Sequence, residues 1–314
     1  DVSRRFALMV DLPFSARLRR ISARWNPRGV LISDAQAHEA LRVLNTRTPA
    51  TPAAALVDAE RVCRAAVHPV LCQPIPSAFR HASFLPTTSA LALGMVLGKS
   101  PLTLLGCHWL YQSHAAGMRY CNYADTSRPL DGALMLKAYA LSTLAACGVA
   151  LFSGKLVARA PRLRLLGSTL PHAAVASAGA VSCVMNASHE LEAGTGFSDA
   201  EGTLLGKSRA VARASVCQAV LFHAALVPAC ALLVPVITLR ALMPYLLRTS
   251  PVLVTPVSAT LTTCCTWCLT PLAAAMVPNT ISIPFSALEL DNQEKVKAAI
   301  GKEPTRVYSD RLLY

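Results

Sequence analysis

The stretch from Trp109 to Asn122 carries several side chains able to bind a polar molecule and is preceded by an apolar segment. At helical spacing, four residues of this stretch fall on roughly one stripe: Trp109, Gln112, Ala116 and Tyr120. We therefore expect Gln112 and Tyr120 to face a hydrated cavity, with Leu110 and Met118 facing apolar surroundings. A helix this polar is stable inside an apolar environment only where it lines water or protein.

A second group with chemical potential is the cysteine cluster Cys264, Cys265 and Cys268, which contains a CxxC spacing. On a helix the three thiols are expected to share one face, and thiolates at such spacings bind zinc. However, no fourth ligand is near in the sequence, and a thiolate is costly to form in apolar surroundings. We expect these thiols to pack against a neighbouring helix, without a metal or any other cofactor.

Catalytic and nucleic-acid-binding functions find no support in the sequence. The chain has no GxGxxG, Walker, HExxH or GxSxG signature, so we expect a protein that is not an enzyme. The net charge is +13, but only 6% of the residues are aromatic. A nucleic-acid-binding surface combines basic residues with stacking aromatic residues, so nucleic acid is not an expected partner.

The elements that must position the polar stretch are apolar segments. Only 15% of the 314 residues are charged, compared with about 25% in soluble domains. Six stretches contain no Asp, Glu, Lys or Arg: 81–98, 100–118, 138–154, 165–189, 214–239 and 249–288. Because about 20 apolar residues cross a bilayer as a helix, the sequence predicts an all-α integral membrane protein with the lipid bilayer as its surroundings.

Charge distribution favours five membrane-spanning helices, with the polar stretch as a separate membrane-associated helix over 101–118. The five predicted spans are 82–98, 133–154, 165–187, 215–239 and 252–277. This division places a net charge of +12 on one side and 0 on the other, whereas a sixth span at the polar stretch gives +5 and +7. Membrane proteins are oriented by basic residues in short loops, so five spans are preferred, with the N-terminus on the positive side.

Soluble parts are expected on both flanks of a membrane domain over 81–280. Region 1–80 has 12 Arg, no Lys and six acidic residues, and a capping box from Ser33 to Gln36 predicts a helix over 34–46. A second short helix is predicted over 56–66. Region 281–314 is expected to hold a C-terminal helix and tail.

Two further turn signals concern the end of the chain. A second capping box from Ser286 to Glu289 predicts a C-terminal helix that runs to Ile300 and ends at Gly301. The loop 194–206 is rich in turn residues, and it is expected to form a small hairpin around 199–202.

Six prolines lie inside or at the edges of the predicted spans: Pro171, Pro228, Pro235, Pro256, Pro271 and Pro278. Broken helices line the binding sites of many secondary transporters. Proline is also common in membrane helices in general, so the prolines leave both interpretations open.

The order and spacing of these features resemble the sideroflexins, five-span proteins of the mitochondrial inner membrane that are associated with amino-acid transport. The polar stretch is similar to the family pattern WxxNQSxNAxxNYxN at six positions: Trp109, Gln112, Ser113, Ala116, Tyr120 and Asn122. Further similarity covers 26–33, His68-Pro69, the region from Asp199 to Gln218, and the segment that begins at Thr270. The resemblance therefore extends over nearly the whole chain.

The chain also departs from the family pattern. The family's HPDTG is here His68-Pro69-Val70-Leu71-Cys72, and Tyr111, Ala115 and Arg119 replace three asparagines of the polar motif. A zwitterionic amino acid needs hydrogen-bond donors and acceptors, because a buried unpaired charge is costly. The chain is therefore a divergent member in this comparison.

The resemblance leaves two functions open. The first is a mitochondrial inner-membrane transporter of serine or another small neutral amino acid, with its N-terminus on the matrix side. Its candidate substrate contacts are Trp109, Gln112, Ser113, Tyr120 and Asn122. The second is a non-transporting accessory or assembly subunit of a respiratory-chain or ATP-synthase complex, with other subunits of that complex as partners.

Overall fold

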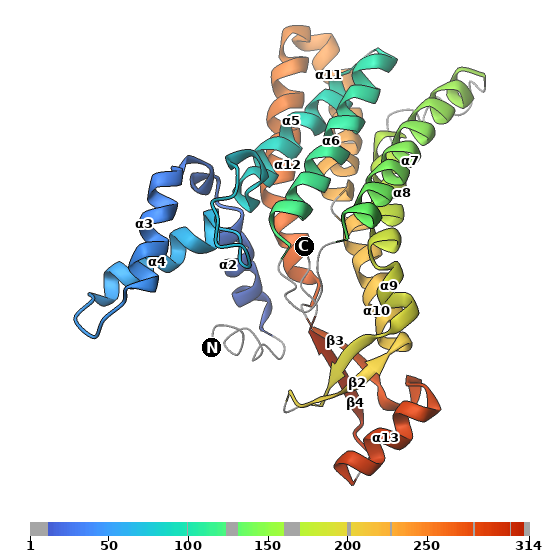
Figure 1. Cartoon of the computed structure of the whole chain (residues 1–314). Helices are drawn as coiled ribbons and strands as arrows, with labels where there is room; N and C mark the ends of the chain where they lie inside the picture. The colour runs from blue at the N-terminus through green and yellow to red at the C-terminus, as the bar shows by residue number, and fades with distance from the viewer. Residues whose placement is uncertain are drawn as a thin grey trace.

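The computed structural model of the chain describes residues 12–98, 100–123, 131–159, 170–199, 202–226, 228–278, 280–301 and 303–310. An N-terminal group of helices lies beside a bundle of long helices, and a small sheet with one further helix lies at one end of that bundle (Figure 1). The N-terminal group consists of α2 (Phe14–Arg24), α3 (Asp34–Asn45) and α4 (Ala53–Ala66). Short 3₁₀ turns at Pro27–Leu31, Ser77–Phe79 and His81–Ser83 connect it to the bundle.

Region 34–66 folds as its capping signals predict. Ser33 Oγ accepts from the Gln36 amide at 3.2 Å, and Gln36 Oε1 accepts from the Ser33 amide at 2.8 Å, which confirms the first capping box. The predicted helices over 34–46 and 56–66 are present as α3 and α4. The second helix begins three residues earlier than predicted, directly after Pro52, which fits the preference for proline at a helix start.

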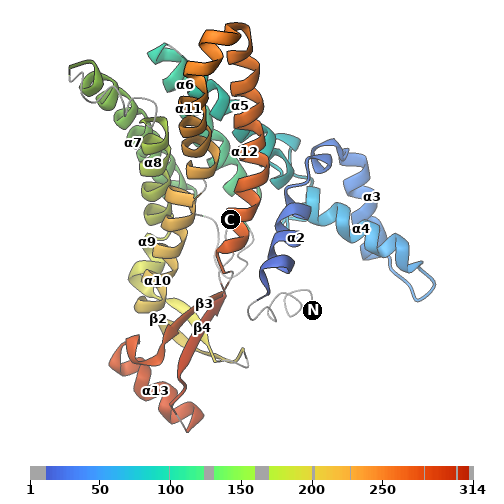
Figure 2. The same cartoon turned by 180° about the vertical axis from the view of Figure 1, so that it is seen from behind.

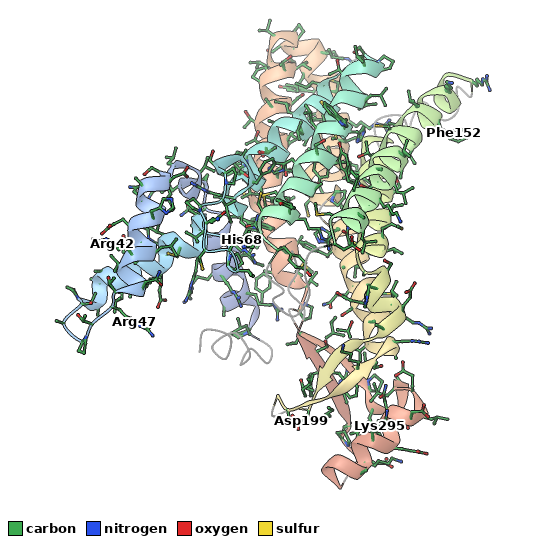
Figure 3. The ribbon with its side chains drawn as sticks, viewed as in Figure 1. Arg42, Arg47, His68, Phe152, Asp199 and Lys295 are labelled. Atoms are coloured by element: carbon green, nitrogen blue, oxygen red, sulfur yellow. The ribbon has the colours of Figure 1, made fainter. Side chains whose placement is uncertain are left out.

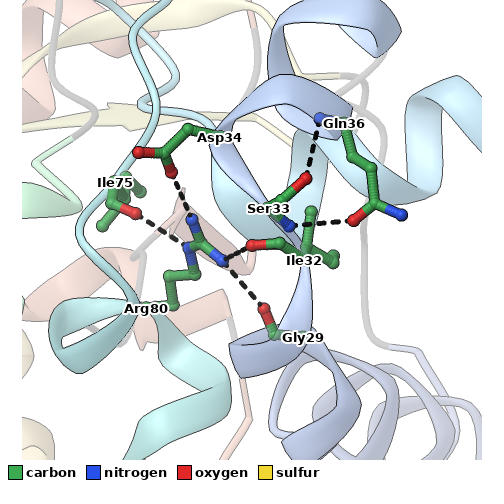
Figure 4. Close-up of polar contacts among 7 residues, drawn as sticks. All are labelled: Gly29, Ile32, Ser33, Asp34, Gln36, Ile75 and Arg80. Atoms are coloured by element: carbon green, nitrogen blue, oxygen red, sulfur yellow. Dashed lines mark hydrogen bonds and ion pairs between the residues drawn. The ribbon is translucent and has the colours of Figure 1, made fainter.

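Arg80 holds the N-terminal helices to the start of the bundle (Figure 4). Its side chain is 1% exposed; Nε donates to the Ile75 carbonyl at 2.8 Å and Nη1 to the Ile32 carbonyl at 2.5 Å. Nη2 lies 3.1 Å from Asp34 Oδ1. Burial lowers the pKa of Arg80, and the negative charge of Asp34 opposes that shift. The charged guanidinium therefore connects segments that are about fifty residues apart in the sequence.

The bundle contains long antiparallel helices. Its first four helices are α5 (Phe84–Leu97), α6 (Pro101–Cys121), α7 (Gly132–Arg159) and α8 (Leu170–Asn186), and its last three are α10 (Arg209–Val220), α11 (Val234–Thr249) and α12 (Val254–Met276). The short helix α9 (Ser188–Ala193) follows α8, and a 3₁₀ turn at Pro251–Leu253 precedes α12. In both views α7 and α8 run side by side (Figure 2). Residues 165–169 of the predicted span 165–187 lie outside the described part of the chain.

Within the described residues, two helices are long and apolar enough to cross a membrane, Gly132–Phe152 and Pro251–Met276. A shorter apolar helix covers His81–Leu97. The helix α5 has 14 residues and is about 21 Å long, whereas the hydrocarbon core is about 30 Å thick. The predicted count of five spans is therefore not confirmed, and the structure supports a mostly helical, membrane-associated protein.

The segments at the two ends of the bundle are not distributed as the five-span topology predicts. Asn122, at the end of α6, donates to the Phe79 carbonyl at 2.8 Å, so α6 returns to the level at which α5 begins. Arg17 Nε donates to the Ala275 carbonyl at 2.8 Å, which brings α2 to the end of α12 near the sheet. The N-terminal helices and residues 289–310 thus lie toward the same end of the bundle, whereas the five-span division separates them.

A four-stranded antiparallel sheet makes the fold mixed rather than all-α. Its strands are β1 (Thr195–Ser198), β2 (Leu204–Ser208), β3 (Thr280–Pro284) and β4 (Arg306–Asp310), in the order β2-β1-β4-β3. The hairpin predicted around 199–202 is present, and its turn is closed by the bond from the Thr203 amide to Asp199 Oδ1 at 2.7 Å. The strands β3 and β4 fall in segments for which no strand was predicted. They are stabilised by pairing and by a shared apolar core: Phe197, Val211, Ile281, Ile283, Phe285, Leu288, Val296 and Val307.

The second predicted capping box, at Ser286, is wrong. The C-terminal helix α13 (Leu290–Ile300) begins only after Glu289, behind a 3₁₀ turn at Phe285–Ala287, although it ends at Gly301 as predicted. Glu289 instead caps α10: its carboxylate accepts from Ser208 Oγ at 2.7 Å and from the Ala210 amide at 2.9 Å. The first amides of a helix lack intrahelical partners and attract a carboxylate, so the tertiary contact replaces the local one.

The segment between α10 and α11 is not regular α-helix. It contains two π-helices, Leu221–Leu226 and Ala229–Leu233, with Pro228 between them and Pro235 just after the second. Each proline removes an amide donor from the helical ladder, and a wider turn accommodates that loss. A Cβ atom placed on Gly179 of α8 would lie 2.8 Å from the His223 carbonyl oxygen, so α8 packs directly on the backbone of the first π-helix.

Gly179→Ala is expected to destabilise the bundle by about 1–3 kcal/mol, because the added methyl group meets backbone that has no side chain to move aside. Gly148→Ala on α7 is the matched control: nothing lies within 4 Å of its added Cβ, and Ala favours a helix over Gly by about 1 kcal/mol. The measurement is the thermal unfolding midpoint of each purified variant in detergent. Equal midpoints for the two variants contradict the close packing.

Glu289→Ala is expected to lower stability by about 1–2 kcal/mol, the usual worth of a helix cap. Burial tends to raise the pKa of Glu289, but bonds from Ser208, its own amide, Asn292 and the Ala210 amide together lower it to about 2. The carboxylate therefore stabilises the fold above its ordinary pKa of 4.5, and that contribution is lost as the pH falls toward 2.

Thermal midpoints of the wild type and Glu289→Ala, measured between pH 7 and pH 3, test this role. The gap between the two proteins should narrow as the solution is acidified. Glu294→Ala, on the exposed side of α13, is the control and should follow the wild type at every pH. A gap that stays constant with pH shows that the carboxylate charge is not responsible.

Candidate functional site

The residues predicted to form one stripe on α6 differ in exposure, because some face the interior of the bundle and others its outer surface. Gln112 is 5% exposed, whereas Trp109 is 52% and Tyr120 57% exposed. Relative to Gln112, these two aromatic residues lie about 60° and about 80° around the helix, which is enough to carry them off the buried face. The expectation that Gln112 and Tyr120 face one cavity is therefore wrong.

The two other predicted contacts join α6 to its neighbours. Ser113 Oγ donates to the Trp109 carbonyl at 2.9 Å and shares a hydrogen bond with the Tyr139 hydroxyl of α7, also at 2.9 Å. Asn122 is buried, and its Nδ2 donates to the carbonyls of Phe79 and Met118. The five predicted residues thus do not form one cluster, and Gln112 and Asn122 are its two buried members.

His108 is a polar interior residue that the sequence analysis did not single out. Its ring is fully buried, and within the described structure neither ring nitrogen has a hydrogen-bond partner. It precedes Gln112 by four residues, so the two side chains lie on the same side of α6, one turn apart. This four-residue spacing was the available signal in the sequence.

A small cavity lies where α5, α6, α8 and the second π-helix meet. Its wall is formed by Thr88, Ala92, Met95, Tyr111, Val175, Pro228 and Leu232. It leaves about 10 Å³ for the centre of a water-sized sphere, which is room for about one water molecule. The Thr88 hydroxyl in this wall is buried and has no hydrogen-bond partner among the described residues, so the cavity has an unsatisfied polar group in its wall.

The cysteine cluster does not form a metal site. Cys265 is buried, whereas Cys264 and Cys268 are exposed, so the three thiols do not share one face as predicted. Within the described part of the chain, no group of three or more His, Cys, Asp or Glu residues is arranged to hold a metal ion.

The turn at His68 shows how the chain accommodates its departure from the family's HPDTG pattern. His68 Nδ1 accepts from the amides of Val70 and Leu71, each at 3.1 Å, and Cys72 has a φ of 52°. Burial lowers the pKa of His68, which keeps the ring neutral and able to accept. The turn lies in the N-terminal group of helices (Figure 3).

Comparison with known proteins agrees with the resemblance in sequence. Residues 11–313 match the family described as Sideroflexins. The chain is 27% identical to Sideroflexin-5 of Rattus norvegicus over 287 residues, covering 88% of this chain and 84% of that protein. It is 30% identical to Sideroflexin fsf1 of Schizosaccharomyces pombe over 228 residues, covering 70% of each chain.

The similarity extends to other members, such as Sideroflexin-2 of Mus musculus, which is 25% identical over 305 residues, covering 95% of this chain and 94% of that protein. No solved structure matches the chain significantly. A family match over nearly the whole length, with the polar motif at its expected place, settles the relationship. The chain belongs to the sideroflexin family.

Proposed function

We propose that this protein carries serine or another small neutral amino acid across the mitochondrial inner membrane. The observation that carries the proposal is the small cavity between α5, α6, α8 and the second π-helix, with the unpartnered Thr88 hydroxyl in its wall. Binding sites of secondary transporters lie inside the bundle at interrupted helices. The two π-helices around Pro228 supply such an interruption.

The polar groups of the interior suit a neutral zwitterion. Hydroxyl and amide groups donate and accept, so Thr88 and Gln112 are able to replace part of the water shell of an amino acid. His108 adds a ring with one donor and one acceptor nitrogen when neutral. A substrate that bonds to Thr88 and His108 satisfies buried polar atoms that lack partners within the described residues, which makes its binding favourable.

The cavity in this conformation is too small for serine, because it holds about one water molecule. Transport therefore requires the bundle to open, as in alternating access. The π-helices are the natural place for that movement, since such turns often mark functional sites within helices.

A second candidate is a non-transporting subunit of a respiratory-chain or ATP-synthase complex. It is supported by the small volume of the cavity, because a subunit without transport needs no room for a substrate. One face of α7 carries exposed large apolar side chains: Leu136, Leu141, Leu144, Leu151 and Phe152. Phe152 lies on the outer side of this helix (Figure 3). Lipid or a neighbouring subunit can cover such a face, so its chemistry fits both candidates.

For orientation we propose that the N-terminus lies on the matrix side. The support is the basic N-terminal region and the preference of basic segments for the inner side. The ends of α7 and α11, which carry the two short basic segments, lie at the opposite end of the bundle (Figure 1). Since α2 lies at the end of α12 near the sheet, the proposal places the sheet toward the same side.

Uptake of labelled serine by the purified protein in liposomes tests the transport function. Gln112→Leu is expected to reduce the initial rate about tenfold, which corresponds to one lost hydrogen bond to substrate of about 1.4 kcal/mol. Gln73→Leu is the matched control, because Gln73 is exposed in the N-terminal region, and its rate should equal that of the wild type.

Two results decide between the candidates. Uptake above empty liposomes, lowered in Gln112→Leu alone, supports the carrier. Wild-type uptake equal to that of empty liposomes, with the native protein migrating in a respiratory or ATP-synthase assembly on a native gel, contradicts the carrier and supports the subunit.

A further inference from the structure

One side of α12 is lined by hydroxyl groups that are completely enclosed. Its members are Ser258, Thr262, Thr266 and Thr270, each no more than 1% exposed. Their spacing of four residues keeps them on one side of the helix over about 18 Å. The neighbouring Thr260 and Thr263 are exposed, so threonine is not buried indiscriminately along this helix.

Two of these four hydroxyl groups form a hydrogen bond within the helix, and the other two form none. Ser258 Oγ donates to the Val254 carbonyl at 2.6 Å, and Thr266 Oγ1 donates to the Thr262 carbonyl at 2.9 Å. This bond to the carbonyl one turn back is the usual one for Ser and Thr within helices. Thr262 Oγ1 and Thr270 Oγ1 are buried and make no hydrogen bond within the described residues.

Unsatisfied hydroxyl groups are costly in such a place. Leaving one buried without a partner costs about 1–3 kcal/mol, and valine fills the same space with no polar atom. Thr262 and Thr270 therefore lower the stability of the fold relative to valine at the same positions. An intermittent polar occupant that bonds to these groups accounts for their presence.

The helix α5 contributes hydroxyl groups at its contact with α12. Trp267 Nε1 of α12 donates to Ser89 Oγ of α5 at 2.9 Å, and Ser89 Oγ donates to the Leu85 carbonyl. The adjacent Thr88 has the unpartnered hydroxyl in the cavity wall. The helix α12 also packs on the second π-helix, which supplies Pro228 and Leu232 to the region of the cavity.

We propose that the buried hydroxyl side of α12 is the path of the polar substrate, with Thr262 and Thr270 as its hydroxyl contacts and Thr88 of α5 as the hydroxyl contact in the cavity wall. The inference rests on the proposed transport function and assigns it a route along residues that the α6 motif does not include. Successive hydroxyl groups one or two turns apart offer a neutral zwitterion replacement hydrogen bonds as it moves, without any charged side chain that would hold it.

Thr262→Val and Thr270→Val test this path, because each removes a hydroxyl group and keeps the shape of the side chain. Since neither hydroxyl has a partner, both variants should keep or raise the thermal midpoint in detergent. Serine uptake into liposomes should nevertheless fall about threefold to tenfold in each. Thr262→Ser, which retains the hydroxyl group, should keep most of the wild-type rate.

Thr263→Val is the matched control one residue away, on the exposed side of α12, and it should transport as the wild type does. The path is overturned if Thr262→Val and Thr270→Val transport at the rate of Thr263→Val, or if they lose stability, since the hydroxyl groups then have a structural role. A wild type without uptake overturns the transport function itself, and the path with it.

Discussion

A polar group inside a membrane bundle has no water to bond with, and this constraint governs the interior of the protein. Pro228 and Pro235 remove two amide donors from one interior helix, which continues as two π-helical segments. The widened backbone comes close enough to α8 that Gly179 is required there. The cavity forms where this segment meets α5, α6 and α8. The position of the site is thus a consequence of where the helix ladder is interrupted.

The interior also shows where the chain tolerates an energetic cost. His108, Thr88, Thr262 and Thr270 are buried with side-chain polar atoms that lack partners among the described residues. A bundle selected only for stability replaces such groups with apolar ones of the same shape. These four residues lie on three different helices, α5, α6 and α12.

Local signals in the sequence predicted local structure well. The capping box at Ser33, the hairpin at 199–202 and the helix end at Gly301 each depend on residues within a few positions of one another. The prediction failed where a distant segment decided the outcome. Glu289 bonds to Ser208, 81 positions earlier, and the pairing of β3 with β4 is fixed by a core that neither strand shows by itself.

The candidate site was predicted only in part for a similar reason. The polar motif predicted a site on α6, but the exposure of each side chain on this helix is set by the neighbouring helices, and these leave Trp109 and Tyr120 outside. The four-residue spacing of the hydroxyl residues on α12 is visible in the sequence. The lack of hydrogen-bond partners at Thr262 and Thr270 is visible only in the structure.

The order of the sheet has a consequence for how the chain is assembled. The strand β4 lies between β1 and β3 and follows both in the sequence, so the hairpin β1–β2 and the strand β3 remain separate until β4 has been synthesised. Between those two parts the chain runs through α10, both π-helices, α11 and α12. Closure of the sheet therefore follows insertion of the interrupted helices, and a chain truncated before residue 306 has an unjoined sheet that quality-control proteases can recognise.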